Sequence, residues 1–358
     1  MKRILSILAG LALIVLAAAV WFMPTSKGDK PLRRAKSTTV NTSAYGNAFK
    51  DVAGHVVDDL HSLMVLKDGE VIYEKYAVGH DADELHTMWS ASKTFTATAI
   101  GFAVQDGLVS LTDRVVDYFD SNVLPKHQSK WLKDMTVYDL LIMSSGLSNG
   151  NFTPDMRAGR MPDPTRQTLS CEVTFKPGTK WSYNSMNSYL LSAIITKVTG
   201  MKMVDYLDGK LFKPLGIRRY YWEESDEGIN SGGWGLYLTT ESLAKMGQFF
   251  LQRGEWDGRQ LLDPEWIDDA MSPHIYQWQG RNNLPEEQIM EVTKDDDWNL
   301  GYGYQMWCCQ HGAARLDGAW GQFCTILPDK NAVVVMTALA EDTKTEYRTL
   351  WKYIYDTL

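Results

Sequence analysis

Cysteine is scarce in this sequence, with only 4 among 358 residues. Cys308 and Cys309 are adjacent and Cys171 and Cys324 stand alone, a spacing that fits neither a disulfide scaffold nor a metal site. Because the stretches around Cys308 and Cys324 both resemble strands, a bridge from Cys308 or Cys309 to Cys324 is one interpretation for an oxidising compartment. Buried free thiols are the other interpretation, and the sequence leaves the two open.

An excess of positive charge is also missing. Lysine and arginine number 36 against 44 aspartates and glutamates, which gives a formal net charge of −8. A nucleic-acid surface needs a basic face, so we expect no nucleic-acid partner. The sequence has no internal repeat either, and at 44% hydrophobic residues it can bury one large core.

Charge is absent from one long apolar run near the N-terminus. Residues 4–23 follow two basic residues, and as a helix they would reach about 30 Å, the thickness of a bilayer core. A signal peptide cut after the small residues Ala17, Ala18 and Ala19 is the alternative. We favour an uncleaved membrane anchor over residues 1–24, because bulky residues follow that cut. Either interpretation predicts export to a periplasmic or other extracytoplasmic side.

The remaining chain divides into a polar tether, residues 25–43, and one large domain, residues 44–358. A hairpin with an Asp68-Gly69 turn begins this domain, and strand-like stretches reappear in its last third. Helical patterns fill the middle, and residues 344–358 form a closing aromatic helix. This order predicts an α+β fold, an antiparallel sheet flanked by helices, with a helical subdomain over about 108–225. Residues 147–176 have no periodicity and are expected to form a long loop.

Ser90 and Lys93 begin the apolar helical stretch MWSASKTFTATAIGFAVQDG, residues 88–107. Residues three apart share one face of a helix, so the amine can point back at the hydroxyl. The alternative is that the serine caps the helix and the lysine extends to water. The pattern alone is weak, because Ser242 and Lys245 repeat it at the start of an amphipathic stretch. There we expect a surface helix that Thr239, Thr240 or Ser242 simply caps.

Burial would give Ser90 and Lys93 a chemical use. An ammonium on an apolar helix is unfavourable, and desolvation lowers the pKa of its amine. A neutral amine can remove the proton of a serine and make it a nucleophile, while N–H groups at the helix start can stabilise an oxyanion. If the helix is buried, the two residues can therefore form a serine nucleophile with a lysine base, a pair that needs no metal or organic cofactor.

Several further blocks follow in a fixed order between about residues 45 and 355. They are TVYDLLIMSSGL, PGTKWSYNSMNSYLLSAIITKVTG, LFKPLGI, GGWGLYLTTESLAKMGQFFLQRGEWDGRQLL, GYGYQMW and GAWGQFCTILPDKNAVVV. With the Ser90 and Lys93 motif, this set resembles the β-lactamase-related serine hydrolases. That superfamily includes class C β-lactamases, D-amino-acid peptidases, penicillin-binding proteins, family VIII esterases and 6-aminohexanoate-oligomer hydrolases. The resemblance implies the β-lactamase/transpeptidase-like fold.

The resemblance also implies roles for individual residues. Tyr183 matches the tyrosine that faces the serine and lysine, often in a Tyr-x-Asn pattern, and is expected to relay a proton. The position usually held by that Asn is Ser185, as in the aminohexanoate-hydrolase branch, and a hydrogen bond is expected from it. The alternative for Tyr183 is a core aromatic residue beside Trp181.

A third block of the family is a strand that carries Lys/His-Thr/Ser-Gly along the cleft. The best match is Leu316-Asp317-Gly318, so Gly318 is expected to let substrate lie against the strand. Ala319 would offer a second oxyanion N–H besides that of Ser90, and Trp320 is grouped with these substrate-binding residues. Arg315 and His311 are near in sequence, but no pattern indicates that they point inward.

Leucine at position 316 departs from the family, which has a cation there. Recognition of a β-lactam or a D-Ala-D-Ala carboxylate would lose a charge-assisted contact of about 1.5–3 kcal/mol. We therefore predict a small-molecule ester or linear amide as the substrate. A β-lactamase or D-Ala carboxypeptidase is the first alternative, and a non-catalytic, membrane-tethered binder or sensor is the second. The natural substrate, the oligomeric state and the role of residues 147–176 stay open.

Overall fold

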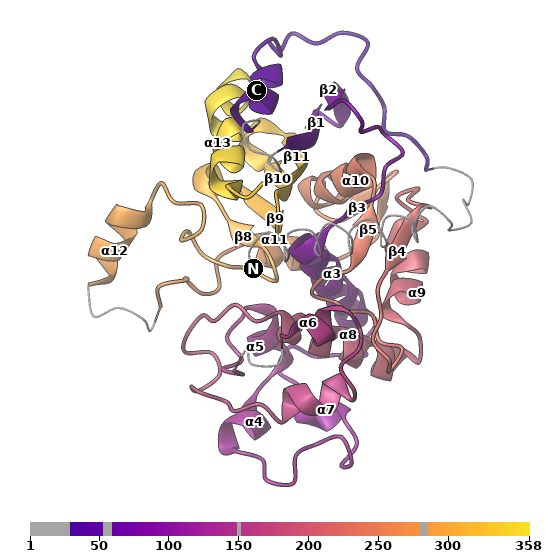
Figure 1. Cartoon of the computed structure of the whole chain (residues 1–358), viewed down its shortest axis with the longest axis vertical. Helices are drawn as coiled ribbons and strands as arrows, with labels where there is room; N and C mark the ends of the chain where they lie inside the picture. Colours follow the sequence, from indigo (N-terminus) through magenta and orange to yellow (C-terminus); the bar gives the residue numbers. More distant parts are fainter. Residues whose placement is uncertain (1–28, 53–58, 149–151, 280–284) are drawn as a thin grey trace, which may run out of the picture.

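The larger sheet of the fold has six antiparallel strands in the order β2-β1-β11-β10-β9-β8 (Figure 1). The computed structural model describes residues 29–52, 59–148, 152–279 and 285–358. The strands are β1 (Asp59–Lys67), β2 (Glu70–Tyr76), β8 (Trp307–Cys308), β9 (Ala314–Gly318), β10 (Gln322–Leu327) and β11 (Ala332–Leu339). Strands from both ends of the chain thus share one sheet, as the sequence predicts.

The hairpin between β1 and β2 turns at Asp68 and Gly69, where the sequence predicts it. Both residues have positive φ, 52° and 80°, the conformation that a tight two-residue hairpin turn needs. An Asp-Gly pair adopts it at little cost in strain, because glycine lacks a Cβ and aspartate tolerates left-handed backbone.

Helices cover both faces of the sheet, and the alternation along β11 assigns residues to each. Val334 and Met336 face the cluster with α13 (Thr343–Tyr353) and α2 (Ala48–Val52). Val333 and Val335 belong to the cluster on the opposite face, which α10 (Thr240–Leu251) covers (Figure 1). This period of two is the one expected of a strand that is buried on both sides.

A helical region lies beyond one end of the sheet, in the lower part of Figure 1. Its helices are α4 (Lys130–Asp134), α5 (Val137–Leu141), α6 (Pro154–Arg157), α7 (Pro164–Leu169) and α8 (Ser185–Thr199). The helix α9 (Met203–Leu207) lies at the right of the view, near β4. The prediction of an unstructured loop over 147–176 was wrong, because α6 and α7 lie inside it. Thr153 caps α6 through its hydroxyl, and Pro154 follows in the first helical position.

The helix α3 (Ser92–Gln105) lies between the sheet and the helical region (Figure 1). Residues Ser92 to Ala103 are all buried, and α3 packs against α8 and β9. It follows the 3₁₀ turn η2 (Trp89–Ala91), so the sequence is right about a buried helix but Ser90 precedes its first α-helical residue. The end of the sheet, α3 and the start of α8 therefore meet around Ser90.

Short elements complete the described chain. A three-stranded sheet joins β3 (His86–Thr87), β5 (Leu236–Leu238) and β4 (Tyr220–Trp222), and β6 (Glu255–Trp256) pairs with β7 (Arg259–Gln260). The other helical elements are η1 (Tyr45–Asn47), η3 (Val115–Tyr118), the π-helical turn η4 (Asp208–Phe212), α11 (Pro264–Met271), α12 (Glu286–Thr293), η5 (Gln310–Gly312), η6 (Pro328–Lys330) and η7 (Tyr355–Thr357).

The described part of the predicted tether is not free. Leu32 donates its N–H to Glu241 on α10, and Arg34 binds Glu74 on β2 and Glu241. Asp29 accepts a hydrogen bond from Ser242, also on α10. The segment from residue 29 therefore covers α10 and the edge of the sheet, unlike a loose linker.

The predicted membrane anchor, residues 1–24, lies outside the described residues. Within the described part, no helix has the length and apolar character needed to span a bilayer. All four cysteines are free thiols, and Cys308, Cys309 and Cys324 are buried. Of the two interpretations of the cysteines, the structure thus has the free thiols.

Candidate active site

Ser90 lies on the 3₁₀ turn η2, at the point where the chain leaves β3 and enters α3. Its side chain is partly exposed, so a substrate can reach it. The preceding residue, Trp89, has a φ of 46°, which is rare for a bulky residue and is typical of functional turns. The turn therefore holds the Ser90 hydroxyl at the accessible end of a buried helix.

Lys93 lies under Ser90, with 1% of its surface exposed. Its Nζ donates to Ser90 Oγ at 3.0 Å, to Ser185 Oγ at 3.1 Å and to the carbonyl of Gly233 at 2.6 Å. All three partners are neutral. No carboxylate of the described residues lies within ion-pair distance of this amine.

Burial lowers the pKa of Lys93 to about 7, and the more distant charge of Asp317 opposes this shift only in part. A buried ammonium without an ion-pair partner is destabilised relative to the neutral amine. At neutral pH a large fraction of Lys93 is thus unprotonated and can accept the proton of Ser90.

Tyr183 faces the same pair, as the resemblance implies. Its ring lies 5.0 Å from Lys93 Nζ, and its hydroxyl forms a hydrogen bond with Ser90. Burial raises the pKa of Tyr183 above the ordinary value even though this hydrogen bond lowers it, so the group is a neutral phenol at neutral pH. Trp307 stacks on the Tyr183 ring at 5.9 Å between centroids and fixes its position.

Ser185 is the first residue of α8, and the cap of that helix places it. Asn184 accepts a hydrogen bond from the N–H of Met186 and donates to the carbonyl of Leu147, both from its side chain. This arrangement directs Ser185 toward Lys93, so the serine in the usual Asn position still reaches the lysine.

Gly233 is a contributor that the sequence reasoning missed. Its carbonyl accepts the shortest hydrogen bond of Lys93, and a Cβ at this position would come within 2.8 Å of the Ser185 carbonyl. Thr96 on α3 also donates to the carbonyl of Gly232. The Gly-rich stretch 232–235 therefore packs directly on α3, a role that its sequence signals only as a tight turn.

The strand β9 brings Gly318 beside the nucleophile turn. A side chain at Gly318 would overlap the carbonyl of Met88, so the missing Cβ lets the chain before Ser90 approach the strand. Its predicted role in admitting substrate stays a prediction. Ala319 and Trp320 form the exposed turn after β9, and Trp320 has a φ of 63°. The predicted oxyanion role of the Ala319 N–H and the predicted substrate contact of Trp320 stay predictions.

Behind this strand lies a buried charged cluster. Arg315 is fully buried and donates to Asp317 at 2.9 Å, with its guanidinium 4.3 Å from the Trp298 ring. Burial raises the pKa of Asp317, and Arg315 opposes this shift. Arg315 thus points into the protein core, whereas His311 is exposed and stacks on Tyr355. In the described structure, neither donates a hydrogen bond to Ser90 or Lys93.

The second Ser-x-x-Lys pair differs from the prediction. Ser242 and Lys245 are both buried, so α10 is not a surface helix. Of the three predicted caps, the structure has Thr239. Ser242 donates to Asp29, while Lys245 donates to the carbonyl of Gly216. The prediction failed because residues 29–34 cover the face of α10 that its polar residues suggested was exposed.

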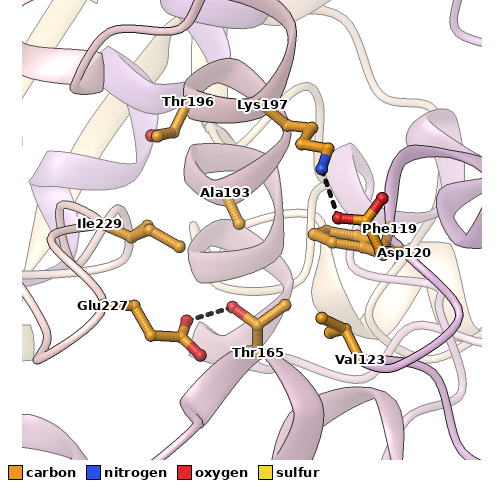
Figure 2. A pocket seen from close by; sticks show the side chains of 9 residues that line it. All are labelled: Phe119, Asp120, Val123, Thr165, Ala193, Thr196, Lys197, Glu227 and Ile229. Atoms are coloured by element: carbon orange, nitrogen blue, oxygen red, sulfur yellow. Dashed lines mark hydrogen bonds and ion pairs between the residues drawn. The ribbon is translucent and has the colours of Figure 1, made fainter.

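A surface pocket of about 310 Å³ lies away from these residues, against α8 (Figure 2). Phe119, Val123, Ala193, Thr196 and Ile229 line it between the Lys197–Asp120 ion pair and the Thr165–Glu227 hydrogen bond. Ser90, Lys93 and Tyr183 are not part of its lining. Within the described residues, no group of His, Cys, Asp or Glu side chains is arranged to hold a metal ion.

Comparisons with known proteins agree with this architecture. The sequence profile of the Beta-lactamase family matches residues 55–358. The 6-aminohexanoate-dimer hydrolase of Paenarthrobacter ureafaciens is 23% identical over 300 residues, which cover 80% of this chain and 74% of that protein.

Two solved structures share the fold. A family VIII carboxylesterase superposes with a TM-score of 0.69 and 16% identity, covering 91% of this chain and 99% of its own. A penicillin-binding protein homologue from Caulobacter crescentus gives a TM-score of 0.69 at 17% identity, covering 90% and 99%. The profile spans most of the sequence, and the solved structures confirm the predicted α+β, β-lactamase/transpeptidase-like fold. The chain belongs to the Beta-lactamase family, and it is an enzyme of the hydrolase class.

Proposed function

We propose that this protein is a serine hydrolase that cleaves small ester or amide substrates through an acyl-enzyme on Ser90. One observation carries the proposal: the amine of Lys93 is buried without an ion-pair partner and lies 3.0 Å from Ser90 Oγ. A lysine in that environment is a base near neutral pH, and the hydroxyl beside it is the one group of the pair that solvent reaches.

In the first step, Ser90 Oγ attacks the substrate carbonyl carbon while its proton moves to Lys93 Nζ. The carbonyl oxygen becomes an oxyanion, which the N–H groups of Ser90 and Ala319 are proposed to stabilise. Ser185 and Gly233 stay hydrogen-bonded to the new ammonium and help to hold its charge.

In the second step, the bond from carbon to the leaving oxygen or nitrogen breaks. The leaving group takes the proton, which passes from Lys93 directly or through the neutral phenol of Tyr183. Water then attacks the acyl carbon and gives one proton to Lys93. The bond from that carbon to Ser90 Oγ breaks, Oγ takes the proton from Lys93, and the acid is released. Tyr183 suits a relay, because its raised pKa disfavours a stable phenolate.

A fluorophosphonate probe tests the nucleophile directly. We expect labelling of the native protein and turnover of short-chain para-nitrophenyl esters, with both lost in Ser90→Ala and kept in Ser242→Ala. Stable labelling without turnover would support the sensor alternative instead. Failure of the native protein to react at all would contradict both interpretations.

A β-lactamase or D-Ala carboxypeptidase is the alternative within the family. Leu316 is fully buried, and Arg315 is bound to Asp317, so strand β9 presents no available cation to a substrate carboxylate. This favours esters and linear amides. Turnover of nitrocefin at rates above those of the para-nitrophenyl esters would reverse the assignment.

We also propose that the protein acts outside the cytoplasm, where residues 1–24 would anchor it to the membrane. The support is the uncharged run of residues 4–23. Protease treatment of intact and lysed cells tests this proposal: the domain should be cleaved from the outer side of the cytoplasmic membrane and remain in the membrane fraction before cleavage.

A further inference from the structure

Arg157 is a cation of the helical region that the mechanism above does not use. It is the last residue of α6, a short helix held in place by the buried side chain of Met156. Its guanidinium lies 5.2 Å from the ring centroid of Trp89 and 5.9 Å from that of Phe152. The positively charged group therefore lies near two aromatic rings.

Both rings connect Arg157 to the proposed active site. Trp89 directly precedes Ser90 in the chain. Phe152 packs edge-on against Trp234 with 5.1 Å between ring centroids, and Trp234 directly follows Gly233, the acceptor of Lys93. The guanidinium thus lies over Trp89, one position before the nucleophile, and over Phe152, whose ring contacts Trp234, the neighbour of Gly233.

The hydrogen-bonding edge of Arg157 is available. The residue is exposed, and its guanidinium has no hydrogen bond or ion pair to any residue in the described ranges. Its neighbour Arg160 instead pairs with Asp155 at 2.9 Å. An aromatic ring covers the flat face of a guanidinium and leaves its N–H fork free to bind a carboxylate with two parallel hydrogen bonds.

Glu223 is a carboxylate that interacts electrostatically with Arg157. The positive charge of Arg157 lowers its pKa, but burial raises it more, and the side chain is engaged by the hydroxyl of Tyr237 at 2.9 Å. Because Glu223 forms no ion pair with Arg157 among the described contacts, the cation keeps its capacity for an external anion.

We propose that Arg157 binds a carboxylate of the substrate, so that the ester or amide cleaved at Ser90 carries a negative charge on one of its two halves. This inference rests on the proposed function and narrows its substrate class to anionic esters and amides. Strand β9 offers no competing cation, since Arg315 is buried and bound to Asp317.

Two pairs of matched esters test the inference. Mono-para-nitrophenyl glutarate and para-nitrophenyl pentanoate differ by a carboxylate on the acyl half. The pentanoate esters of para-hydroxybenzoate and para-hydroxybenzamide differ by a carboxylate on the leaving half. Affinities are measured by calorimetry with Ser90→Ala protein, so that binding is read without turnover.

In this background, Arg157→Gln should weaken binding of at least one anionic ester by about tenfold or more, the effect of losing a charge-assisted contact. The uncharged esters should bind as before, and Arg157→Lys should fall between, because lysine lacks the planar fork. Arg160→Gln is the matched control on the same segment and should leave all four affinities unchanged.

Equal affinities for the charged and uncharged members of both pairs would overturn the inference, as would an equal effect of Arg160→Gln. The proposed hydrolase is judged separately, by turnover of the same four esters with Ser90 intact. Arg157-dependent binding without any turnover would retain the anion site and reject the hydrolysis.

Discussion

Two Ser-x-x-Lys pairs occur in this protein, and both of their lysines are 1% exposed, yet the groups around the two lysines differ in charge. Lys93 has neutral hydrogen-bond partners, two hydroxyls and one carbonyl. Burial lowers the pKa of Lys245 as well, and the nearby carboxylates of Asp29 and Glu241 oppose this shift in part. Ser242 donates to Asp29, whereas Ser90 accepts from its lysine.

The comparison shows that burial of the lysine alone does not make a Ser-x-x-Lys pair reactive. A carboxylate beside a buried lysine keeps the ammonium form, and it also engages the neighbouring hydroxyl as a donor. The neutral surroundings of Lys93 have the opposite effect. Burial lowers the pKa of Lys93 to about 7, because the charge of Asp317 opposes it only in part. The Ser90 hydroxyl beside it stays partly exposed.

The largest contrast is expected from removal of each serine. Ser90→Ala should lower kcat/KM for para-nitrophenyl esters by about 10⁴-fold or more, because the covalent route is lost. Ser242→Ala should leave kcat/KM close to that of the native protein. Comparable losses of kcat/KM in the two variants would contradict the assignment of Ser90 as the nucleophile.

Substitution in the proton path should have the next largest effect. Tyr183→Phe keeps the ring packed on Trp307 but removes the hydroxyl, and we expect kcat to fall by about 10²- to 10⁴-fold, the range of general acid-base catalysis. Steady-state kinetics on esters and on anilides measure this. The loss of kcat should be larger for anilides, because an amine leaves only with a proton. Equal small losses of kcat for esters and anilides would argue against a proton relay through Tyr183.

The pH dependence of kcat/KM should follow the protonation of the Lys93 amine. Lys93 must be neutral to act as a base, so kcat/KM should rise about tenfold per pH unit below about 7 and level above it. Initial rates at constant ionic strength, with a substrate that does not ionise in this range, provide the measurement. A profile that stays flat from pH 5 to about 9 would be incompatible with this base.

Replacing each lysine by methionine should change the free energy of unfolding differently, with the larger loss at Lys245. Lys245→Met leaves Asp29 and Glu241 without their buried cation, and we expect a loss of about 1–3 kcal/mol in the free energy of unfolding at pH 7. Lys93→Met should be neutral or stabilising there. The folded pKa near 7 lies below the usual 10.5, so the contribution of Lys93 to stability rises with pH between these values.

Denaturant titration of the two methionine variants measures these differences. Loss of stability in Lys93→Met as large as that in Lys245→Met would mean that the native state favours both ammonium forms equally.

The sequence predicted the parts of this account that depend on local spacing. A hydroxyl and an amine three residues apart, followed by an apolar helix, place Ser90 and Lys93 together whatever the remaining fold. The resemblance added Tyr183 and Ser185, which lie about 90 positions from the motif. Only that family pattern could bring them into the prediction.

Tertiary contacts decided what the sequence did not reveal. Nothing local to α10 indicates that residues 29–34 cover it, so Ser242 and Lys245 looked like a surface cap. Gly233 contributes a backbone carbonyl, which no side-chain pattern encodes. Arg157 lies within a stretch that lacks periodicity, and its position over Trp89 depends on the packing of α6.

The protonation of one amine is the most direct test of the central claim. With lysines carrying ¹³C at Cε, NMR titration of the native protein against Lys93→Met isolates the signal of Lys93, and Lys245→Met identifies the other buried lysine. The account predicts a midpoint near pH 7 for Lys93. A midpoint close to the ordinary lysine value of about 10.4 would leave Ser90 without a base and contradict the proposed mechanism.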